Sequence, residues 1–133
     1  MPQKRIRNFE SIKTQSRAMK FKSAQKLHDV AISCSYKALV YEGKNDLEKA
    51  KVARKIAFQS EKEAATICHN ATPHPEPTRT ILFRSAGWIA FKAGMIEDAN
   101  EMLKMAKEGD WEHDAENINE LEQKIEKQQN KKL

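Results

Sequence analysis

Apolar and small side chains recur every three or four positions between residues 8 and 42, a stretch that contains neither Gly nor Pro. This spacing places them on one face of a helix, so we expect either one long helix or two helices joined by a kink near Ser23. The residues of this face are Phe9, Ile12, Ser16, Met19, Ser23, Leu27, Ala31, Cys34, Ala38 and Tyr41. Gly43 follows, and we expect it to end the helix in the left-handed conformation that Gly adopts without strain.

A second helix is expected to begin after Asn45 and Asp46, because both are good N-cap residues and Glu48 lies three positions after Asn45. Its inward face is predicted to comprise Leu47, Ala50, Ala53, Ile56 or Ala57, Ala64 and Ile67. We expect this helix to end by about Asn70. The three prolines within residues 71–77 then predict a linker, since no regular helix accommodates them.

The rest of the pattern predicts three shorter helices. Thr78 is expected to cap a helix over residues 79–93, which Gly94 closes, and another helix is expected over residues 96–108. A last amphipathic helix within residues 111–128 carries its apolar side chains at Ala115, Ile118, Leu121 and Ile125.

These elements predict a single all-α domain of about five helices in this chain of 133 residues. Residues 8–70 are expected to form a long first hairpin, residues 71–77 the linker, residues 78–108 a second hairpin and residues 111–128 a capping helix. The low content of Gly and Pro, four residues of each, agrees with a helical fold. The sequence shows no apolar stretch long enough for a signal peptide or a transmembrane span, so we expect a cytoplasmic protein that binds no membrane.

Small residues stand at corresponding places in the two predicted hairpins, 49 positions apart as measured from Ala38 to Gly87. The corresponding residues are Ala38, Tyr41, Ala50 and Ala57 in the first hairpin, and Gly87, Gly94, Ala99, Leu103 and Ala106 in the second. This arrangement resembles the tetratricopeptide repeat, although the usual period of that family is roughly 34 residues and Arg54 and Ala90 depart from its pattern. The resemblance implies stacked helical hairpins that bind other proteins and catalyse no reaction.

The resemblance also implies a groove lined by the first helix of each hairpin. By position, its residues are Ser35, Leu39, Glu42, Ile81, Arg84, Trp88, Phe91 and Lys92. Arg84, Trp88 and Lys92 are spaced four positions apart and share one face, which suits an acidic or carboxylate-bearing peptide. We therefore expect a partner protein or peptide to bind through Leu39, Arg84, Trp88, Phe91 and Lys92. In the alternative interpretation, the two aromatic side chains pack beneath the last helix and the two cationic ones face solvent.

Charge is unevenly distributed along the chain. Residues 1–28 contain eight Lys and Arg against one Glu, a net charge of +7, whereas residues 97–122 contain ten acids against two Lys, a net charge of −8. The basic segment suggests nucleic-acid binding as an alternative function, through Lys13, Arg17, Lys20, Lys22 and Lys26. No base-reading motif or interleaved aromatic residue accompanies these charges. We therefore favour a solvated face, or a pairing with the acidic segment within the molecule or across a homodimer.

Candidate catalytic and metal-binding residues are few. The dipeptides His28-Asp29 and His113-Asp114 are similar to those of helical metal-dependent phosphohydrolases, but the further His and Asp ligands of such sites are missing. Three residues near the linker lack the paired spacing of a zinc site, namely Cys68, His69 and His74. The sequence contains no Gly-rich phosphate loop, nucleophile elbow or HExxH motif. We therefore expect no enzymatic activity, no cofactor and no bound metal.

Overall fold

The computed structural model describes the backbone of residues 2–109 and 111–131 and the side chains of residues 20–109 and 112–131. Within these residues it contains five α-helices, one short 3₁₀ helix and no strand, which confirms the predicted all-α fold. The elements are α1 (Pro2–Gly43), α2 (Leu47–Asn70), α3 (Thr78–Lys92), α4 (Ile96–Lys107), the 3₁₀ helix η1 (Trp111–Asp114) and α5 (Ala115–Lys131).

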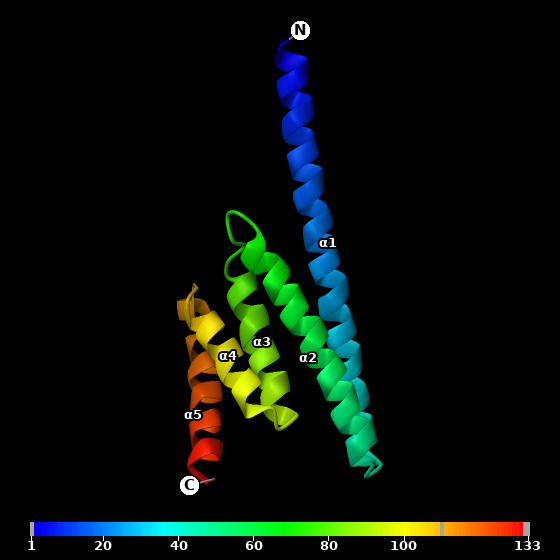
Figure 1. Ribbon diagram of the computed structural model, residues 1–133, viewed down its shortest axis with the longest axis vertical. Helices are drawn as coiled ribbons and strands as arrows, with labels where there is room; N and C mark the ends of the chain where they lie inside the picture. Colours follow the sequence, from blue (N-terminus) through cyan, green and yellow to red (C-terminus); the bar gives the residue numbers. More distant parts are fainter. Residues whose placement is uncertain (1, 110, 132–133) are drawn as a thin grey trace.

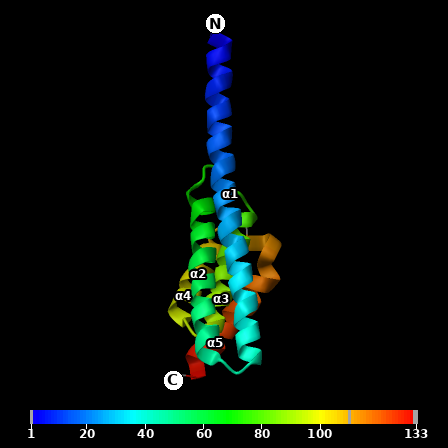
Figure 2. The ribbon, with the colours of Figure 1, turned by 90° about the vertical axis from the view of Figure 1, so that its right-hand side faces the viewer.

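The helices lie side by side in the order of the sequence, and each runs roughly antiparallel to the one before it (Figure 1). α1 is one unbroken helix, so the chain adopts the first of the two arrangements expected for this segment, without a kink at Ser23. The C-terminal part of α1 packs along α2, whereas its N-terminal part extends beyond every other helix (Figures 1 and 2).

The turn between α1 and α2 and the turn between α3 and α4 have the same hydrogen bonds. In the first turn the N–H of Asn45 donates to the carbonyl of Glu42 at 2.9 Å, and the N–H of Asp46 donates to the carbonyl of Tyr41 at 2.8 Å. The same two bonds recur 49 positions later around Gly94, at 3.0 and 2.9 Å. The two hairpins therefore share a turn geometry as well as a spacing of small residues.

The expectation that Gly43 adopts the left-handed conformation is wrong. Gly43 is the last residue of α1, and the left-handed residue of this turn is Asn45, with a φ of 60°. Asn tolerates this conformation better than most residues because its short polar side chain bonds locally. Its counterpart in the second turn is Gly94, with a φ of 80°. Asp46 then caps α2, since its side chain accepts the N–H of Lys49 at 3.2 Å.

The pattern of burial also repeats between the hairpins. Five buried positions of the first hairpin correspond to buried positions 49 residues later, and these pairs are Ala31 and Thr80, Ala38 and Gly87, Ala50 and Ala99, Ala53 and Met102, and Ala57 and Ala106. Two residues expected on the inward face of α2 are instead exposed, Leu47 by 63% and Ile56 by 49%. The buried face of α2 is centred on its alanines, so Ala57 rather than its neighbour Ile56 faces inward.

α5 covers the side of the second hairpin that faces away from α2 (Figure 1). Its side chains Ile118, Leu121 and Ile125 are fully buried in the main core, and Lys107 of α4 forms an ion pair with Glu122 of α5. Leu121 reaches α3 so closely that a Cβ added to Gly87 would lie 2.8 Å from its Cδ2 atom. α5 therefore packs on α3 so closely that a Cβ at Gly87 would require the Leu121 side chain to shift.

The start of α3 differs from the expected cap. Thr78 is the first residue of α3 and not its N-cap, and the preceding Pro77 makes no side-chain capping bond. The capping role falls to the carboxylate of Glu76, which accepts the backbone N–H of Thr80 at 3.0 Å and its hydroxyl at 2.7 Å. Arg79, which is buried, donates to the carbonyl of Met105 in α4 at 3.0 Å. Glu76 thus ties the linker to α3, and Arg79 ties α3 to α4.

Candidate protein-binding groove

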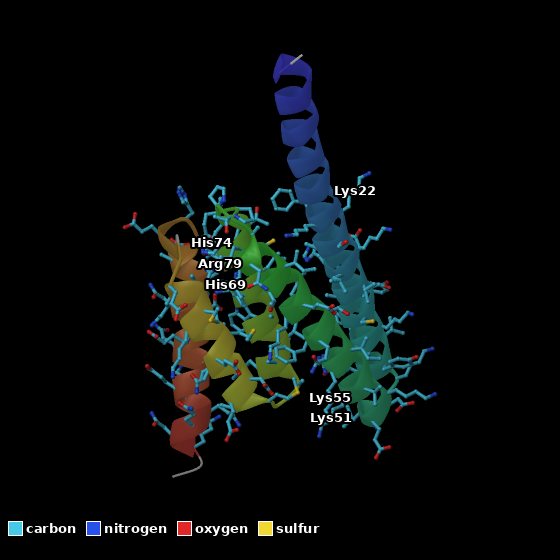
Figure 3. All side chains as sticks on the ribbon, turned by 45° about the horizontal axis from the view of Figure 1, so that its top comes forward. Lys22, Lys51, Lys55, His69, His74 and Arg79 are labelled. Carbon is cyan, nitrogen blue, oxygen red and sulfur yellow. The ribbon has the colours of Figure 1, made fainter. Side chains whose placement is uncertain are left out.

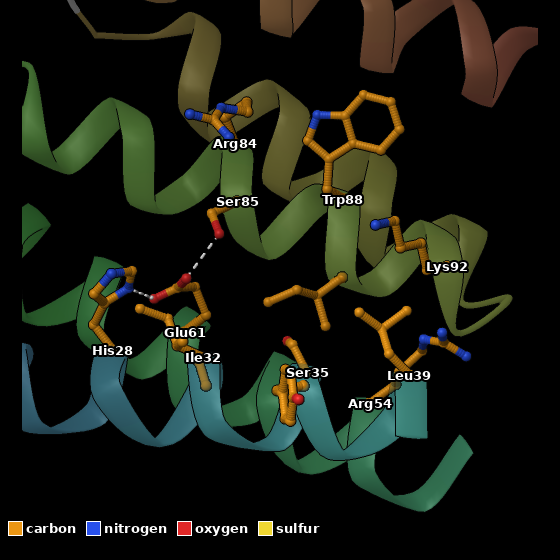
Figure 4. A pocket seen from close by; sticks show the side chains of 13 residues that line it. His28, Ile32, Ser35, Leu39, Arg54, Glu61, Arg84, Ser85, Trp88 and Lys92 are labelled. Carbon is orange, nitrogen blue, oxygen red and sulfur yellow. Dashed lines mark hydrogen bonds and ion pairs between the residues drawn. The ribbon is translucent and has the colours of Figure 1, made fainter. Parts of the chain in front are cut away.

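A groove of about 540 Å³ runs between α1 and α3, with α2 as its floor (Figure 4). Its lining comes from α1 (His28, Ala31, Ile32, Ser35, Tyr36, Leu39), α2 (Arg54, Glu61) and α3 (Arg84, Ser85, Trp88, Ile89, Lys92). The first helices of the two hairpins therefore stand on opposite sides of one open cleft.

The wall that α1 contributes is apolar and exposed. Ile32, Tyr36 and Leu39 are exposed by 56, 68 and 58%, and all three line the groove. A cluster of large apolar side chains on a surface of this kind is typical of a protein-binding site, because water contact with them is unfavourable until a partner covers them. Across the groove, α3 contributes Ile89 and the half-buried Trp88.

A buried carboxylate at the floor of the groove joins three helices. Glu61 of α2 is only 1% exposed, and its two oxygens lie 2.7 Å from Nδ1 of His28 in α1 and 2.7 Å from Oγ of Ser85 in α3 (Figure 4). The hydroxyl of Ser85 donates to one oxygen, and the imidazole of His28 is paired with the other. These bonds compensate for the removal of the charge from water, which would otherwise be costly. The same bonds fix the separation of α1 and α3 at this point.

The arginines around the groove are paired within the molecule. Arg84 donates through Nε to Asp114 of η1 at 2.7 Å, and Asp114 is itself buried. Arg54 forms an ion pair with Glu42 at 2.7 Å, and this hydrogen bond lowers the pKa of the Glu42 carboxyl below its ordinary value, with a smaller contribution from the charge of Lys92. The positive charge available to an acidic ligand is therefore smaller than the sequence suggests.

A second cavity of about 440 Å³ continues the groove toward the linker and shares His28 with it. The side chains of α1 that line the two cavities recur every three or four positions and form one stripe, which comprises Phe21, Gln25, His28, Ile32, Ser35 and Leu39. The 19 residues from Phe21 to Leu39 span a length of about 27 Å, since each step along a helix rises about 1.5 Å. The Glu61 bridge divides this cleft into two compartments.

The structure brings four of the five residues expected to bind a partner to this groove, namely Leu39, Arg84, Trp88 and Lys92. Leu39 and Lys92 extend into the space between α1 and α3, whereas Arg84 and Trp88 stand along the edge that faces away from α1 (Figure 4). Trp88 is half-buried: it packs against the main core and also lines the groove, so it combines the packing role and the binding role considered for it.

Phe91 is not among the groove residues. It packs against the main core and meets the ring of Trp88 edge to face, with ring centroids 6.1 Å apart. Of the other positions implied by the resemblance, Ser35 lines the groove, Ile81 lines the second cavity, and Glu42 is held by Arg54. Phe91 therefore supports the groove wall from behind.

Sequence reasoning missed eight of the groove residues, namely His28, Ala31, Ile32, Tyr36, Arg54, Glu61, Ser85 and Ile89. Glu61 had a recognisable signal, because it lies four positions after Ala57 and three before Ala64, on the buried face of α2. A charged residue on such a face is unusual unless it is paired. The stripe on α1 was overlooked because it runs beside the more regular stripe of small residues that packs on α2.

The lysines proposed for nucleic-acid binding lie on α1. Lys20, Lys22 and Lys26 are exposed, whereas the side chains of Lys13 and Arg17 lie outside the described residues. At 3.6 residues per turn, Lys22 lies about 200° around the helix from Lys20. The described lysines therefore lie on two sides of this part of α1 and do not form a single stripe.

The histidines near the linker have structural partners. His69 stacks on His74 with ring centroids 5.1 Å apart, and its Nδ1 accepts the Nε–H of Arg79 at 2.9 Å (Figure 3). In the part of the chain that the structure describes, no group of three or more His, Cys, Asp or Glu side chains is placed to hold a metal ion. No helix among the described residues combines the length and the apolar character that crossing a membrane requires. No protein-family model, curated protein or solved structure matches this chain.

Proposed function

We propose that the protein is a non-enzymatic adaptor that binds a partner protein through the groove between α1 and α3. The observation that carries this proposal is the exposure of Ile32, Tyr36 and Leu39 along one wall of an open cleft. Burial of these side chains by a partner would be favourable, since apolar surface removed from water contributes about 25 cal/mol per Å².

An amphipathic helix is the partner segment that fits this groove best. A cleft with a length of about 27 Å matches a helix of about 18 residues. Such a helix would present apolar side chains every three or four positions to the α1 wall. Because Arg84 and Arg54 are already paired with acids, apolar contact would contribute more to binding than charge. The ligand proposed here is therefore an amphipathic helix, in place of the acidic or carboxylate-bearing peptide that the sequence suggested.

We further propose that the two hairpins are divergent tetratricopeptide-like units. Three features support this: the spacing of 49 residues, the matching hydrogen bonds of the two turns, and the five pairs of buried positions. The longer spacing results from the length of α2 and from the linker that follows it. In this family the first helices line the binding groove, as α1 and α3 do here.

Affinity capture from cells that naturally produce the protein tests the adaptor proposal. Leu39→Glu places a charge in the groove and should abolish capture of the partner, because the charge would lose its water on binding. Ile56→Glu is the matched control, since Ile56 is similarly exposed but lies outside the groove. Both substitutions are at exposed positions and should leave helicity unchanged. Equal capture by the wild-type protein and by Leu39→Glu would place the interface elsewhere.

Nucleic-acid binding by α1 is the second candidate function. The specific observation in its favour is that Lys20, Lys22 and Lys26 are exposed on the part of α1 that lies beside the linker, and that α1 extends beyond the other helices N-terminal to them (Figure 1). A helix about 10–12 Å wide fits the DNA major groove. Binding through phosphates should weaken steeply as salt rises. Absence of any gel retardation of duplex DNA or RNA at low salt would eliminate this candidate.

A further inference from the structure

The two ends of the groove differ in charge. Figure 4 shows Arg54 and Lys92 near Leu39, at the end of the groove away from His28. Both cations act on the carboxylate of Glu42, whose pKa is lowered by the hydrogen bond from Arg54 at 2.7 Å and further by the charge of Lys92. Because two cations share this one carboxylate, the group of three side chains carries a net positive charge.

Lys92 is the cation that stays available to a ligand. Arg54 and Arg84 are each paired with an acid, and Glu61 is held in the polar bridge at the floor of the groove. Lys92, in contrast, is exposed and forms no ion pair with any residue that the structure describes. Its side chain lines the groove and extends into the space opposite Leu39 (Figure 4). A ligand in the groove would therefore meet one uncompensated positive charge at this end.

The second cavity, at the opposite end of the cleft, offers no such charge. Among the described residues that line it there is no Lys, Arg, Asp or Glu, and its walls are largely apolar, with Phe21, Ala24, Pro75, Ile81 and Leu82. An ionised group placed there would lose contact with water without gaining a charged partner, which is costly. An apolar side chain avoids this cost and gains from burial.

We propose that the partner helix carries an acidic residue at the end that meets Lys92, and an uncharged apolar residue where it fills the second cavity. This inference rests on the proposed function, because it requires a helix in the groove. Ile81 and Lys92 lie 11 positions apart on α3, a distance of about 16 Å. In a helix lying alongside α3, the apolar residue and the acid are therefore separated by about three turns. Because complementary charge contributes more to specificity than to affinity, Lys92 selects which way round an amphipathic helix lies in the cleft.

Selection from a displayed peptide library tests the proposal. The probe is a library of peptides of about 18 residues, with leucine at every third or fourth position and all other positions randomised. The library is selected on the whole wild-type chain and counter-selected on Leu39→Glu, so that only peptides that need the groove are retained. These peptides should carry Asp or Glu in one terminal turn and should lack charged residues about three turns away from it.

Charge reversal at Lys92 supplies the direct comparison. The same library selected on Lys92→Glu should yield Lys or Arg at the terminal position that carried the acid. Lys55→Glu is the matched control, because Lys55 is exposed but lies outside both cavities, and it should select acids as the wild type does. For one acid-bearing peptide, Lys92→Glu should raise the dissociation constant about 3- to 10-fold at low salt, and less at high salt. The same peptide with Lys in place of its acid should bind Lys92→Glu more tightly than the wild type.

Ile81→Glu tests where the other end of the helix lies. Ile81 lines the second cavity and is 38% exposed, so this variant should keep its helicity by circular dichroism and select Lys or Arg about 11 residues from the acid of the peptide. Peptides that need Leu39 but show no terminal acid, that keep the acid on Lys92→Glu, or that place the base at no fixed separation would overturn the inference and leave the adaptor function standing. If no peptide prefers the wild type to Leu39→Glu, the groove and the inference both fail.

Discussion

The close packing of α5 on α3 predicts an unusual response to adding a methyl group at Gly87. A Cβ at this position would lie 2.8 Å from Cδ2 of Leu121, whereas carbon atoms pack best at about 3.5–4.0 Å. Leu121 is fully buried, so its side chain has little room to move aside. Forcing an extra methyl group into a packed core costs about 1–3 kcal/mol, while replacing Gly by Ala inside a helix gains about 0.5–1 kcal/mol. Gly87→Ala should therefore lower the free energy of unfolding by up to about 2.5 kcal/mol.

A double-mutant cycle with Leu121→Val isolates this contact. Shortening Leu121 removes the obstructing methyl group and should itself cost about 1 kcal/mol. In that background Gly87→Ala should become stabilising by about 0.5–1 kcal/mol, because only the helix preference remains. The assay is urea unfolding followed by circular dichroism. If Gly87→Ala raises the free energy of unfolding by the same amount in both backgrounds, α5 does not pack on α3 as described. The reverse exchange at the equivalent position, Ala38→Gly, should be destabilising by about 1–2 kcal/mol.

Three further outcomes are expected. Ser85→Ala removes one of the two hydrogen bonds to the buried carboxylate of Glu61 and should lower the free energy of unfolding by about 1–3 kcal/mol; an unchanged urea midpoint would contradict this. Burial, and to a lesser extent the charge of Glu76, raises the pKa of the Cys68 thiol. A thiol reagent should therefore modify Cys34 well before Cys68. Peptide mapping that finds Cys68 modified first would contradict the burial of Cys68. Arg54 lowers the pKa of Glu42 below its ordinary value of 4.5, so in Arg54→Ala the carboxyl should titrate closer to 4.5 by NMR. Because the folded-state pKa is the lower one, the pair stabilises the fold above the ordinary pKa and ceases to do so as the pH falls through the lowered value. Arg54→Ala should therefore lose stability at neutral pH and little in strong acid, and an equal loss at both would count against the pair.

The helices could be predicted from the sequence because Gly, Pro and the spacing of apolar residues act locally. The breaks near Gly43, Gly94 and the prolines of residues 71–77 all separate helices in the structure. The backbone conformation within each break was harder to predict. Because Gly tolerates positive φ, Gly43 was expected to be the left-handed residue of the first turn. The 49-residue spacing that relates Ala38 to Gly87 also relates Asn45 to Gly94, and these two are the residues with positive φ. The internal repeat was therefore a better guide to the turn than residue type alone.

The groove was only partly predictable because its chemistry depends on helix packing. Position within the hairpins indicated Leu39 and Lys92, since first-helix residues of both units face one cleft. The partners of Glu61 lie 33 and 24 residues away in sequence, and no local pattern relates them. Likewise Arg84 meets an acid 30 residues later, in a 3₁₀ helix that periodicity does not reveal. Charge counted along the sequence thus overstated the positive charge offered to a ligand.

The carboxylate that bridges three helices also determines how the cleft can respond to an occupant. Glu61 holds α1 and α3 together at one point along the length of the groove, with open space on either side of it. Because α1 and α3 both pack on α2 as well, their spacing is held along their length. A ligand that lies along the whole cleft must therefore pass over the polar contact of His28, Glu61 and Ser85, which lies between the two compartments.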